Sequence, residues 1–133
     1  MTSPDTVTAT VRIAAPPTAV FPYLVEPALL AEWLGGLAEM APQPGGVFAV
    51  DVGESVRGHW VTIDPPRRVV FTWSVAGTNV LPPGSTTVEI VLIPEGQDTI
   101  VQLTHRGLPP AELGNHKSGW ARFLDRLVHT ALP

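Results

Sequence analysis

Three histidines, His59, His105 and His116, are the polar residues that could titrate near neutral pH inside a pocket. His105 lies among apolar residues in an extended segment, and His116 precedes Trp120 by four residues, one helical turn away on an apolar stripe. Each of these two side chains either meets a polar group of a ligand or hydrogen-bonds to backbone, and we favour the backbone role. A three-histidine metal site is not predicted, because no local spacing supports it.

The chain contains four tryptophans. Three of them either line an apolar cavity that stacks a flat or hydrophobic ligand or fill a core between helix and sheet: Trp33, Trp73 and Trp120. The cavity is favoured for Trp73. The face of Trp60 stays open: Val61 and Ile63 occupy the opposite face of the alternating pattern, and an outward position of Trp60 is therefore one alternative. An outward Trp60 would indicate a dimer or partner surface.

No catalytic constellation accompanies these residues. Asp51 and Glu89 fall on extended segments, on the faces that we expect to point outwards. General acid–base catalysis needs a carboxylate in a desolvated cleft with a perturbed pKa, and no nucleophile elbow or triad motif is present. We therefore predict no catalytic residue, no metal site and no cofactor.

Composition narrows the class of protein. A length of 133 residues predicts one domain, residues 1–133, and a hydrophobic fraction of 44% argues against disorder. Without cysteine there is no disulfide framework, thiol nucleophile or zinc–thiolate site. A net charge of -4 with scattered basic residues argues against nucleic acid as a partner.

Residues 1–10 lack the basic and apolar regions of a signal peptide. No apolar run reaches the length that spans a bilayer. The expectation is a cytoplasmic protein without a membrane partner.

Hydrophobic periodicity predicts the order of the elements. Residues 6–13 alternate as a half-buried strand, and prolines then open two short helices at 17–24 and 27–34, the first bent by Pro22. Five further strands are rich in β-branched residues: 47–52, 56–63, 69–75, 86–93 and 99–105. The last helix carries one apolar stripe: Trp120, Phe123, Leu124, Leu127, Val128 and Ala131. Short connections favour antiparallel neighbours. The pattern predicts an α+β domain in which a curved six-stranded antiparallel sheet packs on a long C-terminal helix.

Several segments, in this order along the chain, carry a resemblance. They are APP at 15–17 with Val20-Phe21, PALLAEW at 27–33, PGGVF at 44–48, DPPRRVVFTW at 64–73, LTHRGL at 103–108, and HKSGW at 116–120 leading to LDRL at 124–127. The sequence resembles the homologues of the activator of the heat-shock-protein-90 ATPase (AHSA-type), within the SRPBCC (START-like) superfamily. The resemblance implies the helix-grip (START-like, Bet v-like) fold, with a cavity between the long helix and the sheet.

The resemblance and the aromatic residues together lead to a functional hypothesis. The chain is expected to be a non-catalytic protein that binds a small hydrophobic or aromatic molecule in this cavity. Two alternatives stay open: a chaperone-interaction module like the heat-shock-protein-90 ATPase activators, and a polyketide cyclase-like enzyme with His105 or His116 as base. A homodimer and a cavity filled by its own side chains also stay open. The expected cavity residues are Trp33, Phe48, Phe71, Trp73, His105, His116, Trp120, Phe123 and Leu124.

Overall fold

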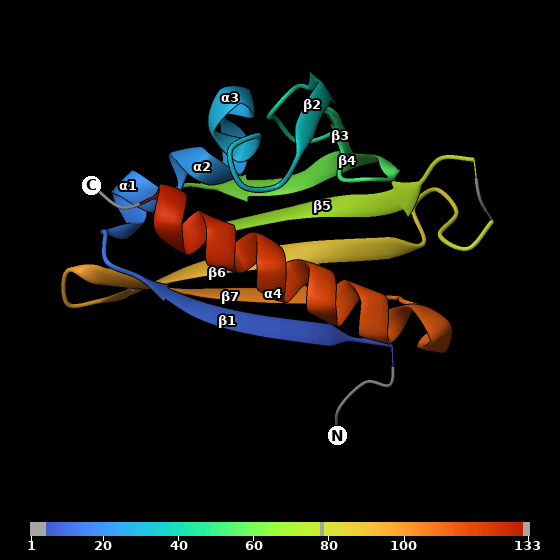
Figure 1. Ribbon diagram of the computed structural model, residues 1–133. Helices are drawn as coiled ribbons and strands as arrows, with labels where there is room; N and C mark the ends of the chain where they lie inside the picture. The colour runs from blue at the N-terminus through green and yellow to red at the C-terminus, as the bar shows by residue number, and fades with distance from the viewer. Residues whose placement is uncertain (1–4, 78, 132–133) are drawn as a thin grey trace.

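Antiparallel strands and a long C-terminal helix dominate the computed structural model, which describes residues 5–77 and 79–131 (Figure 1). Residues 1–4, which belong to the segment 1–10 that lacks the features of a signal peptide, lie outside the described residues. The described strands are β1 Val7–Ile13, β2 Gly36–Met40, β3 Val47–Asp51, β4 Ser55–Asp64, β5 Arg68–Val75, β6 Thr86–Glu95 and β7 Asp98–Arg106. The helices are α1 Pro17–Val20, α2 Pro22–Val25, α3 Pro27–Leu30, the 3₁₀ turn η1 Pro110–Glu112 and α4 Leu113–Thr130.

The strands form one sheet in the order β1-β7-β6-β5-β4-β3-β2, with every neighbouring pair antiparallel. The first strand returns to pair with the last, so that Val7 lies opposite His105. Helix α4 crosses one face of the sheet, and the short helices lie near its C-terminal end (Figure 1). The predicted α+β helix-grip fold is thereby confirmed.

Prolines divide the segment after β1 into three helices of four residues each. The predicted bend at Pro22 is a break, because α1 ends at Val20 and Pro22 begins α2. Proline has no N–H to continue the hydrogen-bond ladder. The second predicted helix is also shorter than expected: α3 ends at Leu30, and residues 31–34 form a turn.

The sheet has a strand, β2, that the sequence pattern did not predict, so the described sheet has seven strands where six were expected. β2 pairs with β3, and its register shifts between Leu37 and Glu39, which destroys the alternation that marks a strand. Gly35 precedes it with φ +154°, and a Cβ there would overlap the carbonyl oxygen of Asp51. The absence of a side chain at Gly35 therefore allows the backbone of β3 to approach closely.

The face of Trp60, which the sequence pattern left open, is the buried one, since its side chain is 0% exposed. Trp60 lies opposite Phe71 and Ile63 opposite Val69, with a register shift between Trp60 and Thr62. This bulge places Trp60 and Ile63 on one face although they are three residues apart, and it leaves Val61 46% exposed. A dimer surface formed by an outward Trp60 is therefore excluded.

Helix α4 begins at Leu113, seven residues before the first residue of its apolar stripe. It includes both Gly114 and Gly119, and it therefore carries His116 on the same helix as Trp120. Its buried side chains face the sheet: Trp120, Phe123, Leu124 and Leu127. None of the helices in the described part of the chain combines the length and apolar character needed to cross a membrane.

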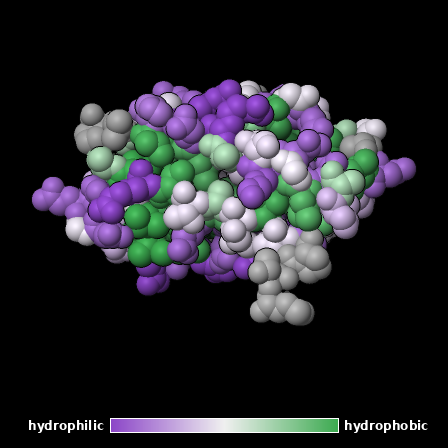
Figure 2. Space-filling view, turned by 60° about the horizontal axis from the view of Figure 1, so that its bottom comes forward, coloured by the Kyte–Doolittle hydropathy of each residue, from purple (hydrophilic) through white to green (hydrophobic). Residues whose placement is uncertain are grey.

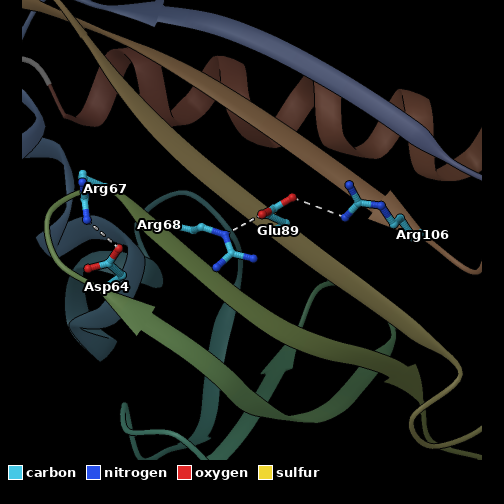
Figure 3. A network of polar contacts seen from close by, with 5 residues as sticks. All are labelled: Asp64, Arg67, Arg68, Glu89 and Arg106. Atoms are coloured by element: carbon cyan, nitrogen blue, oxygen red, sulfur yellow. Dashed lines mark hydrogen bonds and ion pairs between the residues drawn. The ribbon is translucent and has the colours of Figure 1, made fainter.

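The opposite face of the sheet carries charged side chains. Asp51 and Glu89 point outwards as predicted, and Glu89 on β6 accepts from Arg68 Nε at 2.5 Å and from Arg106 Nη1 at 3.3 Å (Figure 3). The hydrogen bond from Arg68 is the main reason that the pKa of Glu89 lies below its ordinary value. In Figure 2, hydrophobic side chains show in patches with hydrophilic and neutral ones between them.

Candidate binding pocket

A pocket of about 320 Å³ lies between the N-terminal half of α4, strand β5 and the turn that joins β3 to β4. Three buried aromatic side chains form its apolar part: Trp73, Trp120 and Phe123. Exposed residues at its rim, among them Glu54 and Arg122, show that it opens to solvent. The pocket therefore combines an apolar floor with a charged mouth.

Helical spacing brings the α4 residues of the pocket to one side. His116, Gly119, Trp120 and Phe123 occupy positions i, i+3, i+4 and i+7, and all of them line the pocket. Gly119 leaves space there, because a Cβ at this position would meet only Phe123 Cε2, at 3.9 Å. The glycine that lowers helix propensity keeps this part of the pocket open.

Two tryptophans meet across the helix–sheet boundary. The ring centroids of Trp73 on β5 and Trp120 on α4 are 5.0 Å apart, with the rings tilted by 55°. Phe123 continues the surface at 5.8 Å from Trp120, in an edge-on arrangement. Such aromatic surfaces offer flat, polarisable contact area to a ring-containing ligand.

A buried hydrogen-bond chain holds these two tryptophans. Trp120 Nε1 donates to His105 Nδ1 at 3.0 Å, and an indole nitrogen has no other role than donor. His105 Nδ1 is therefore unprotonated, and Nε2 carries the proton that it donates to Thr86 Oγ1 at 2.9 Å. The Thr86 hydroxyl in turn donates to the carbonyl oxygen of Trp73. This hydrogen-bond network connects the α4 side of the pocket to its β5 side.

His105 is neutral within this hydrogen-bond network. The pKa of His105 is lowered from 6.5 to about 3, mainly by burial and in addition by the nearby His116. Protonation of His105 would replace the acceptor of the Trp120 N–H by a second donor. Both ring nitrogens are occupied, so His105 has no lone pair with which to take a proton from a substrate.

His116 differs from His105 in both position and partner. Its ring is half-buried, lines the pocket and stands 5.2 Å from the ring of His105. Its Nδ1 donates to the carbonyl oxygen of Glu112 at 2.9 Å, which is the predicted backbone hydrogen bond. The same prediction is wrong for His105, whose partners are side chains.

Of the nine predicted cavity residues, the structure places four in the lining of this pocket: Trp73, His116, Trp120 and Phe123. The other five lie in the core: Trp33, Phe48, Phe71, His105 and Leu124. Trp33 Nε1 donates to the carbonyl oxygen of Tyr23 at 2.8 Å, and this bond fixes the turn after α3 against α2.

Phe48 and Phe71 stack on each other, with ring centroids 4.1 Å apart. Both rings are buried in the hydrophobic core.

The sequence interpretation missed the polar rim of the pocket. Glu54 comes from the β3–β4 turn, and Glu112 and Asn115 come from the start of the helical region. These three residues also border a second hollow of about 210 Å³, which includes Val75 and Leu81. A helix start at residue 113 would have indicated Glu112 and Asn115, whereas nothing in the sequence pattern brings Glu54 to the helix.

No group of three or more potential metal ligands was found within residues 5–77 and 79–131.

Comparison with known proteins identifies the family. The profile described as "Activator of Hsp90 ATPase homolog 1-like protein" matches residues 14–131. The chain therefore belongs to this family, as its segments suggested. A comparison with curated proteins gave no match.

Solved structures agree with this assignment. The AHSA1-like protein RHE_CH02687 from Rhizobium etli is 40% identical, with a TM-score of 0.76 over 95% of this chain and 81% of that chain. CalU16 from Micromonospora echinospora is 26% identical, with a TM-score of 0.81 over 96% of this chain and 76% of that one. PFC0360w, described as an HSP90 activator from Plasmodium falciparum, is 25% identical, with a TM-score of 0.80 over 92% and 93% of the two chains.

Proposed function

We propose that this protein binds a small hydrophobic or aromatic molecule in the pocket beside α4 and does not convert it chemically. The observation that carries the proposal is the apolar floor of Trp73, Trp120 and Phe123 under an open mouth. Its volume of about 320 Å³ falls at the lower end of the range of small-molecule sites.

The predicted residues take two roles in this proposal. Trp73, His116, Trp120 and Phe123 contact the ligand, since they line the pocket. The rest support that surface from the core: Trp33, Phe48, Phe71, His105 and Leu124.

The arrangement of polar groups supports a binding role over catalysis. A general base needs a free lone pair in a desolvated cleft. His105 is desolvated but has both nitrogens engaged, and Glu54 is an exposed carboxylate at the rim. His116 lines the pocket with Nδ1 bonded to the carbonyl oxygen of Glu112, but its ring is half-buried and not desolvated.

Two leucine substitutions on α4 test the site. Gly119→Leu places a side chain into the pocket, whereas Gly114→Leu adds the same side chain at a position outside its lining where a Cβ meets nothing within 4 Å. Both replace a helix glycine by a strong helix former, so both variants should fold. The probe is the neutral dye N-phenyl-1-naphthylamine, titrated by fluorescence, with circular dichroism to verify folding.

The wild type and Gly114→Leu should bind the dye equally, and Gly119→Leu should bind at least about tenfold more weakly. Equal binding by all three proteins would place the dye elsewhere, and absence of saturable binding to the wild type would remove the proposal.

A second candidate function is a chaperone-interaction module. It is favoured by the family description and by the relative from Plasmodium falciparum that is described as an HSP90 activator. The test adds the purified protein to a heat-shock protein 90 and measures ATP hydrolysis. A dose-dependent rise in rate, unchanged in Gly119→Leu, would support a role independent of the pocket. An unchanged rate with no complex on gel filtration would exclude it for that chaperone.

A further inference from the structure

His116 is a pocket residue with one ring nitrogen that has no protein partner. Its Nδ1 lies 2.9 Å from the carbonyl oxygen of Glu112, and a carbonyl oxygen can only accept. In the neutral ring the proton is therefore on Nδ1, and Nε2 has a lone pair that can only accept a hydrogen bond. No residue in the described part of the chain donates to this Nε2 atom.

The Nε2 atom of His116 is accessible, in contrast to the unpartnered nitrogens of the core. Within residues 5–77 and 79–131, the side-chain nitrogens that are buried without a partner are Nε1 of Trp60 and Nε1 of Trp73. His116 Nε2 has no partner either, but it is not among these buried atoms. A molecule that contacts the half-buried ring can therefore reach it.

Helix α4 places this ring beside the apolar floor of the pocket. His116 lines the pocket one turn before Trp120, and Gly119 lies on the same side of the helix. A Cβ at Gly119 would meet only Phe123 Cε2, at 3.9 Å, so there is space next to the histidine. The ring of His105 is 5.2 Å away, but both of its nitrogens are engaged and it cannot donate to His116. The donor for His116 Nε2 must then come from solvent or from a bound molecule.

We propose that His116 Nε2 accepts a hydrogen bond from the bound molecule, so that the preferred ligand is a neutral, flat ring system bearing a hydroxyl group, as in a phenol. This inference rests on the proposed function and specifies the ligand for the same pocket. The carboxylates of Glu54 and Glu112 outnumber the guanidinium of Arg122 in the lining and disfavour an anion. A hydroxyl group is also less costly to desolvate against the buried aromatic floor than an ammonium group.

The test compares 1-naphthol with 1-methoxynaphthalene, which share a ring system and an oxygen atom but differ in whether that oxygen can donate. His116→Phe removes both ring nitrogens and keeps an aromatic ring, whereas His116→Gln keeps an amide oxygen that can accept. His129→Phe is the matched control. His129 also lies on α4, with Nδ1 2.7 Å from the carbonyl oxygen of Asp125 four residues earlier, but it is outside the pocket lining.

Affinities are measured by isothermal titration calorimetry. The wild type should bind 1-naphthol about fivefold more tightly than 1-methoxynaphthalene, which is the worth of one neutral hydrogen bond. His116→Phe should abolish this preference, His116→Gln should retain part of it, and His129→Phe should leave it at its wild-type value. A preference that persists in His116→Phe, or that is absent from the wild type, would overturn the inference.

A measurement on the wild type removes any dependence on how well the variants fold. In a long-range ¹H–¹⁵N spectrum of the histidine rings at pH 8, above the ordinary histidine pKa of about 6.5, His116 should carry its proton on Nδ1 and His105 on Nε2. 1-Naphthol should move the His116 Nε2 signal upfield, and 1-methoxynaphthalene should produce no comparable shift. An unchanged Nε2 signal at saturating 1-naphthol would refute the hydrogen bond.

The same compounds separate this inference from the proposed function. If N-phenyl-1-naphthylamine binds but the protein does not prefer 1-naphthol to 1-methoxynaphthalene, only the present inference fails. If none of the three compounds binds, the proposed function fails with it.

Discussion

Replacing His105 by glutamine should make the stability of the protein less sensitive to acid than that of the wild type. The histidine is buried and neutral, and its pKa lies at about 3 in the folded chain against 6.5 ordinarily. Between these two values the unfolded chain binds a proton that the folded chain does not bind. The stability contributed by neutral His105 is therefore fully present above pH 6.5 and is lost as the pH falls towards 3.

The magnitude follows from proton linkage. One extra proton on the unfolded chain lowers the free energy of unfolding by about 1.4 kcal/mol for each pH unit. Between pH 7.5 and 4.5 the wild type should lose roughly 2–3 kcal/mol from this residue alone. Glu89, a carboxylate with a lowered pKa, lies on the other face of the sheet. Its contribution to stability changes only below its ordinary pKa of 4.5, which is outside the range from pH 7.5 to 4.5.

Glutamine suits the test because it preserves the polarity of the site. Its amide oxygen can accept from Trp120 Nε1, and its amide nitrogen can donate to Thr86. The variant should cost about 1–2 kcal/mol at pH 7.5, since the amide fits less well than the ring.

The assay is urea unfolding followed by circular dichroism at pH 7.5, 6.5, 5.5 and 4.5. His129→Gln, which removes an exposed histidine from α4, serves as the control and should follow the wild type. Wild type and His105→Gln should converge as the pH falls. Parallel profiles would show that the folded chain can accommodate a protonated His105, and they would refute the hydrogen-bond chain described above.

Two further substitutions test the frame around the pocket. Glu89→Gln should destabilise by about 1 kcal/mol at pH 7, because Arg68 and Arg106 lose their shared carboxylate. Since the pKa of Glu89 is lowered, this difference is present above pH 4.5 and should vanish as the pH falls below it; a difference that persists in acid would contradict the ion-pair explanation. Gly35→Ala should cost more than Gly45→Ala, by about 1–3 kcal/mol in thermal unfolding. Both glycines have positive φ, but only at Gly35 does a Cβ overlap backbone, and equal costs would refute the close approach of β2.

Local periodicity was enough to predict most of the framework. Strands with clean alternation, such as β1 and β7, and the apolar stripe of α4 follow directly from side-chain burial on one face. The failures lie where the backbone departs from regular geometry. The bulge after Trp60 reverses the alternation of β4, and the register shift in β2 removes the pattern altogether.

The pocket could be predicted only in part for a related reason. Its apolar floor combines β5 and α4, and residue type together with spacing indicated Trp73, Trp120 and Phe123. Which other aromatic residues fill the core depends on packing across the whole sheet, as the stacked pair Phe48 and Phe71 shows. The rim residue Glu54 reaches the pocket through a tertiary contact between a turn and a distant helix, and no local pattern records such a contact.

Native mass spectrometry tests the central claim most directly. Wild type, Gly119→Leu and Gly114→Leu would each be incubated with one library of neutral aromatic compounds and measured before and after denaturation. The account predicts discrete adducts on the wild type and on Gly114→Leu, released by denaturation, and none of these on Gly119→Leu. The same adducts on all three proteins, or none on the wild type, would contradict a ligand site in the pocket between α4, β5 and the β3–β4 turn.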